Sequence, residues 1–94
     1  MEQKTFSTSD LYLASALSVF LNTLPELQVT GRVVVFFFPA SDALFRAIEA
    51  FNKGTALNAL EYSRMIKKLK GDMLSMRDMA RAGIAFGGKN ATGR

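Results

Sequence analysis

The first part of the chain has the hydrophobic spacing of an amphipathic helix. Its apolar positions recur every three or four residues and are Leu13, Leu17, Phe20, Leu21 and Leu24. Ser9 and the two hydroxyl residues before it supply oxygens that can cap the N-terminus of the helix, and the negative charge of Asp10 is favourable in a first helical turn. Pro25 ends the helix. We predict a helix over about Ser9–Thr23, with Lys4–Phe6 as a candidate short strand before it.

Two extended segments follow, on either side of Gly31. Apolar and polar residues alternate in Glu26–Thr30, whereas Val33–Phe38 is apolar at every position and is followed by Pro39. A dense run of β-branched and aromatic residues favours a strand over a helix. We therefore predict a β-hairpin whose second strand is Arg32–Phe38.

The uniformly apolar strand presents two apolar faces. These faces consist of Val33, Val35 and Phe37 and of Val34, Phe36 and Phe38. A strand that is buried on one side alternates between apolar and polar residues, so we expect both faces to be covered. Either three helices sandwich a small sheet, or two chains meet there, sheet face to sheet face or edge to edge.

The remaining apolar pattern predicts two more helices. Ser41 opens the first, and Gly54 closes it with a left-handed residue. Asn58 with Glu61 three residues later resembles a capping box, and the helix that it opens runs to about Ala82. The expected fold class is α+β, in the order helix, β-hairpin, helix, long C-terminal helix.

The chain of 94 residues is long enough for one domain and too short for two. We place a single α+β domain at residues 1–86 and a Gly-rich, polar C-terminal tail at 87–94.

The long helix carries a heptad pattern of apolar residues. Its positions are Tyr62, Ile66, Leu69, Met73, Met76 and Ala80. The pattern fits either a core-facing stripe or an interface. A helix of about 25 residues is about 37 Å long, against about 32 Å for the diameter of a compact chain of this size, so we expect part of it to overhang. The candidate interface residues are Met73, Met76 and Met79 on this helix and Val33, Val35 and Phe37 on the strand.

Positive charge is concentrated in the C-terminal part. The net charge is +4: residues 1–56 have four basic and five acidic residues, and residues 57–94 have eight and three. Four of the basic residues lie within about 80° of one another on the long helix. They are Lys67, Lys70, Arg77 and Arg81. This flank fits a phosphate backbone. We favour a solvated helix flank, because no aromatic residues are interleaved for base stacking.

Catalytic residue types are scarce. Histidine and cysteine are absent, which removes the usual general base, the usual nucleophile pairs and thiolate metal sites. The eight carboxylates are scattered singly. We predict that the protein is not an enzyme and has no cofactor, metal or small-molecule substrate.

One segment near the C-terminus fits the phosphate-loop pattern G-x-x-x-x-G-K. It spans Gly83–Asn90, with Asn90 where a magnesium-binding Ser or Thr belongs, and it follows a helix instead of a strand. We interpret this segment as part of the tail.

The longest uncharged stretch, Leu11–Pro25, is too short and too polar to span a bilayer, and no basic leader precedes it. A cytoplasmic location without a membrane partner is the expectation. The leading functional hypothesis is a non-enzymatic interaction module, as a homo-oligomer or with a protein partner. The alternative is a nucleic-acid-binding protein that uses the basic helix flank.

Several segments carry a family resemblance. They are Thr8–Leu17, the hairpin at Gly31-Arg32 with Phe36 and Phe38, Phe51–Gly54, Tyr62, and Leu69-Lys70. Over about residues 5–70 they resemble a family of small uncharacterised bacterial and phage domains of unknown function. The resemblance implies no activity or site residues, and the chain departs from the family by extending its last helix beyond Lys70.

Overall fold

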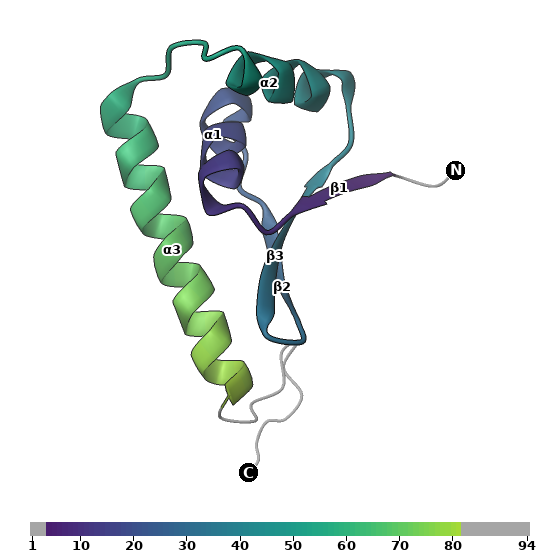
Figure 1. Ribbon diagram of the computed structural model, residues 1–94, viewed down its shortest axis with the longest axis vertical. Helices are drawn as coiled ribbons and strands as arrows, with labels where there is room; N and C mark the ends of the chain where they lie inside the picture. The colour runs from purple at the N-terminus through teal and green to yellow at the C-terminus, as the bar shows by residue number, and fades with distance from the viewer. Residues whose placement is uncertain (1–3, 82–94) are drawn as a thin grey trace.

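The computed structural model describes residues 4–81, which fold as a three-stranded antiparallel sheet with three helices. In chain order its elements are β1 (Thr5–Thr8), α1 (Leu11–Leu21), β2 (Glu26–Thr30), β3 (Val33–Pro39), α2 (Asp42–Asn52) and α3 (Ala59–Arg81). Figure 1 shows α1 beside both α2 and α3, with β3 running through the middle of the sheet. The predicted α+β class is confirmed, and the candidate first strand is present as β1.

The most apolar strand occupies the centre of the sheet. The strand order is β1-β3-β2, and β3 pairs antiparallel with both neighbours. The pairing of Thr30 with Val33 leaves Gly31 and Arg32 as a two-residue turn, in which Gly31 has a φ of 64°. A glycine with positive φ at the first turn position matches the right-handed twist of the paired strands.

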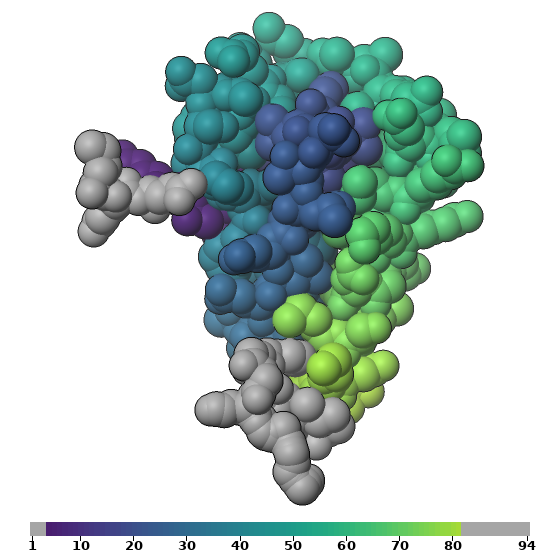
Figure 2. Space-filling view, turned by 180° about the vertical axis from the view of Figure 1, so that it is seen from behind, coloured from purple at the N-terminus to yellow at the C-terminus, as the bar shows by residue number. Residues whose placement is uncertain are grey.

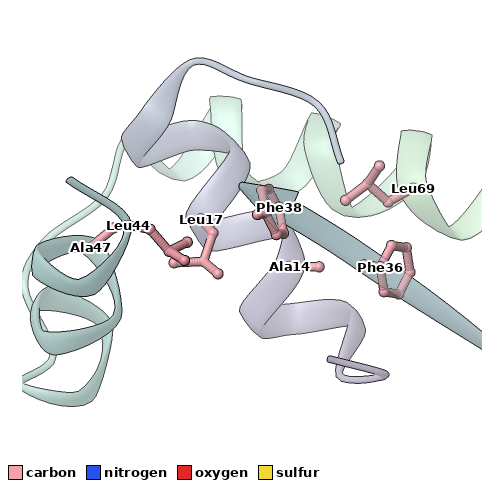
Figure 3. Packing of buried hydrophobic residues seen from close by; sticks show 7 residues of the cluster. All are labelled: Ala14, Leu17, Phe36, Phe38, Leu44, Ala47 and Leu69. Carbon is pink, nitrogen blue, oxygen red and sulfur yellow. The ribbon is translucent and has the colours of Figure 1, made fainter. Parts of the chain in front are cut away.

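The core lies between one face of β3 and the helices. Burial alternates along the strand, so that Val34, Phe36 and Phe38 are buried. Figure 3 shows the central cluster, to which four elements contribute. Its members are Ala14 and Leu17 from α1, Phe36 and Phe38 from β3, Leu44 and Ala47 from α2, and Leu69 from α3.

All three helices therefore pack on the same side of the sheet. Leu17, Leu44 and Leu69 each belong to the cluster that contains Phe36 and Phe38. The first expected arrangement, helices on both faces of a small sheet, is wrong for residues 4–81. The face that bears Val35 and Phe37 is only partly buried, and Val33 on this face is 48% exposed.

Helix α1 begins later than the sequence predicts, because Asp10 is its cap and not part of its first turn. The Asp10 side chain accepts hydrogen bonds from the backbone N–H groups of Tyr12 (2.9 Å) and Leu13 (3.2 Å). The helix ends before Pro25, where Asn22 adopts the left-handed conformation with a φ of 52°. Asparagine takes that conformation more easily than most residues.

The caps of the other two helices agree with the prediction. The Ser41 hydroxyl accepts a hydrogen bond from the N–H of Leu44 (3.1 Å), and the side-chain Oδ1 of Asn58 accepts one from the N–H of Glu61 (2.9 Å). Gly54 has a φ of 77°, as expected for a residue that closes a helix. No helix within residues 4–81 has the length and apolar character to cross a membrane.

The expected overhang of the long helix is not observed. Helix α3 has 23 residues, a length of about 35 Å, and the β2–β3 hairpin extends beside its C-terminal part (Figure 1). None of the six heptad positions is exposed, and Leu69 among them is buried. Along the length that the structure describes, the heptad stripe therefore faces the domain's own core and hairpin.

Two glycines give a matched test of these backbone conformations. A Cβ added at Gly31 or at Gly71 meets no atom within 4 Å, but only Gly31 has a positive φ. Gly71→Ala is expected to raise the free energy of unfolding by about 0.5–1 kcal/mol, because alanine favours the helix interior. Gly31→Ala is expected to lower it by about 1–2 kcal/mol through backbone strain. Urea denaturation of both variants measures the change in the free energy of unfolding. A change in the same direction in both variants would contradict the positive φ at Gly31.

Candidate functional site

The first candidate surface is the sheet face away from the helices, which we call the outer face. It consists of Thr5 and Ser7 from β1, Val33, Val35, Phe37 and Pro39 from β3, and Glu26, Gln28 and Thr30 from β2. The apolar residues form a central column, and both flanking strands present polar side chains. Glu26 is the one charged residue among these nine.

The outer face continues into a hollow at the end of the sheet. This hollow has a volume of about 340 Å³ and is lined by Thr5, Thr23, Leu24, Glu26, Phe37, Phe38 and Pro39. Leu24, just before β2, is exposed beside it. Sequence reasoning assigned Leu24 to the buried stripe of the first helix, but α1 ends at Leu21 and leaves Leu24 at this surface.

The three candidate interface methionines do not form one exposed seam. Met73 packs against the core cluster, Met76 is half-buried, and Met79 is 39% exposed. Each also lies on the helix side of the sheet, away from the outer face with Val33, Val35 and Phe37. The six candidate interface residues therefore fall on two separate surfaces.

The predicted basic flank is also divided by the fold. Lys67 and Lys70 are exposed near the middle of α3. Arg77 is half-buried and Arg81 lies in the last turn, about 10–20 Å further along the helix. Within residues 4–81, Arg81 is the one member of the four that forms an ion pair, with Asp78 at 3.9 Å.

The C-terminal end of α3 and the hairpin turn enclose a pocket of about 500 Å³. Its lining residues are Val29, Gly31, Arg32, Arg77, Ala80 and Arg81. Figure 2 shows this end of α3, in yellow-green, lying against the blue hairpin. We call this hollow the arginine pocket. Sequence reasoning missed Arg32, since no local pattern relates a turn residue to a helix 45 positions away.

Residues 4–81 hold no cluster of three or more histidine, cysteine, aspartate or glutamate residues suited to a metal ion. Partial burial, with nearby Asp10 and Tyr12, raises the pKa of the Tyr62 phenol above its usual value. This hydroxyl donates to the Tyr12 carbonyl (3.2 Å) and joins α3 to α1. The phosphate-loop-like segment Gly83–Asn90 and the predicted tail lie outside the described residues.

Comparison with family models, with curated proteins and with solved structures finds no match to this chain. The resemblance to small bacterial and phage domains stays a prediction. Function is therefore inferred from the two surfaces.

Proposed function

We propose that this chain is a non-enzymatic interaction module that self-associates through the outer face of its sheet. The proposal rests on one observation: the three helices leave uncovered the apolar column of Val33, Val35 and Phe37. The lack of histidine and cysteine throughout the sequence supports a role without catalysis.

A second copy of the chain is the occupant that suits this face. A twofold axis that lies between the two sheets, parallel to their planes, places the column of one copy on the column of the other. Thr5, Ser7, Gln28 and Thr30 then meet uncharged surface, and Glu26 stays at the rim in water. Two sheet faces stack in this way at about 10 Å, with strands about 30° apart.

The size of the face predicts a weak dimer. Three strands about 4.8 Å apart and about 20 Å long cover about 300 Å² in projection. A stable interface buries about 800 Å² of each partner. The adjoining hollow at Leu24 enlarges the contact, but the total remains small. We therefore expect a reversible equilibrium between monomer and dimer that shifts with protein concentration.

Sedimentation velocity across a range of concentrations tests this proposal. The expected result is a mass that rises from 10.3 kDa toward twice that value. This rise should persist at high salt, because apolar burial is not screened by ions. A single 10.3 kDa species at several hundred micromolar would overturn self-association.

Four charge-introducing variants locate the interface. Val33→Lys and Phe37→Lys place a cation on the outer face, and both are expected to abolish the dimer. Phe45→Lys is the matched control, because Phe45 is 55% exposed on α2 and lies outside this face. Circular dichroism confirms that each variant is folded. Met79→Lys tests the helix surface: loss of the dimer in this variant alone would assign the interface to α3 and contradict the outer-face proposal.

A further inference from the structure

The arginine pocket is lined by three arginines from two distant parts of the chain. Arg32 belongs to the β2–β3 turn, whereas Arg77 and Arg81 belong to the last turns of α3. The packing of α3 beside the hairpin is what joins them. This pocket is on the helix side of the sheet, so an occupant there is independent of the proposed dimer.

Charge within the pocket is poorly balanced. Asp78 is the one carboxylate that pairs with any of the three arginines in residues 4–81, and its contact with Arg81 is long and exposed. The C-terminal end of a helix favours nearby cations, which accounts for Arg81. It does not account for Arg32, whose position is set by the hairpin.

Arg77 supplies the observation that points to a ligand. Its side chain is half-buried, and its Nε atom is buried without a hydrogen-bond partner in residues 4–81. A buried donor without an acceptor is unfavourable, and more so on a charged group. An anion held by the Arg77 guanidinium would offset its charge and would reduce the repulsion among the three arginines.

We propose that the arginine pocket binds a phosphate group of a phosphorylated ligand. Guanidinium groups match phosphate oxygens with paired N–H donors, which favours phosphate over a simple halide ion. The volume of about 500 Å³ is within the range of ligand pockets, so the phosphate need not be a free ion. Gly31 contributes only main chain to the wall, which leaves that side open to a larger group.

Titrations followed by amide NMR test the site with three probes: inorganic phosphate, adenosine triphosphate, and a short DNA duplex. The expected result is saturable movement of the Gly31 and Arg32 amide signals with at least one probe at low salt. Absence of any movement with all three probes at millimolar phosphate would overturn the proposal.

Arg77→Gln and Arg32→Gln are each expected to weaken binding by about tenfold, the loss of about one charge-assisted hydrogen bond. Lys70→Gln is the matched control, because it removes the same charge from α3 outside the pocket. It should change the affinity by less than about twofold. The thermal melt of each variant checks its fold. If Arg77→Gln is destabilised, Arg32→Gln still tests the site, because Arg32 lies in an exposed turn.

The probes also distinguish the source of the phosphate. Triphosphate binding that depends on Arg32 and Arg77 assigns the pocket to a small phosphorylated molecule. Duplex binding with the same dependence assigns it to a nucleic-acid backbone, and both outcomes support the site. Two results would overturn the phosphate site: binding that the two arginine variants do not weaken, or binding that Lys70→Gln weakens to the same extent. Either result would indicate a diffuse electrostatic attraction to the basic helix.

Discussion

Phe36→Ala is expected to lower the free energy of unfolding by about 3–5 kcal/mol, the usual cost of truncating a buried phenylalanine. Phe36 is fully buried at the centre of β3, in the cluster that includes residues of all three helices. A domain has about 5–15 kcal/mol of stability in total. The melting temperature should therefore fall by more than about 10 °C, and the purified variant should be partly unfolded or poorly expressed.

Phe45→Ala provides the matched control for this truncation. The same side chain is removed, but Phe45 is largely exposed on α2, and alanine is a better helix former. Its expected effect is within about 0.5 kcal/mol. Thermal and urea melts of the two variants measure the difference. Comparable losses in both would contradict the assignment of the core to the Phe36 face of the sheet.

Leu69→Ala is the second substitution with a large expected effect, and it should lower the free energy of unfolding by about 2–5 kcal/mol. Leu69 is 1% exposed and is the residue through which α3 enters the core cluster. The smallest losses in this range occur where neighbours collapse into the cavity. Met65 and Met73 also pack against this cluster, and flexible methionine side chains can fill part of the space.

Leu74→Ala tests whether this loss is specific to the inward face of α3. Leu74 is on the same helix but is 42% exposed, so its replacement should change stability by no more than about 0.5 kcal/mol. A helix that projected from the domain would give similar small effects at both positions. That outcome would restore the overhang that the heptad pattern and helix length first suggested.

The same packing explains why the two candidate surfaces are separate. Core residues from α1, α2 and α3 join Phe36 and Phe38 in one buried cluster, which leaves the opposite face of β3 without a helix. Helix α3 then continues along the hairpin to its turn, where Arg77 and Arg81 line the same pocket as Arg32. One layer of helices thus creates both an open apolar face and a basic pocket.

Local features of this fold were predictable from sequence because they depend on neighbouring residues. The caps at Ser41 and Asn58 and the glycine turn at Gly31 follow from short-range hydrogen bonding and backbone conformation. The helical and extended segments follow from the period of the apolar residues. Even the inward stripe of α3 was visible, although its pattern fitted a core and an interface equally well.

The tertiary structure decided which apolar surfaces are covered and which distant residues meet. The six apolar residues of β3 do not specify on which side the helices pack, since both faces are similar in sequence. Nor does any local signal place β1 beside β3, or the turn residue Arg32 beside Arg77. Such contacts depend on the packing of whole elements around a common core. A local stretch of sequence determines its own periodicity and short-range hydrogen bonding, but not the position of a segment 45 residues away.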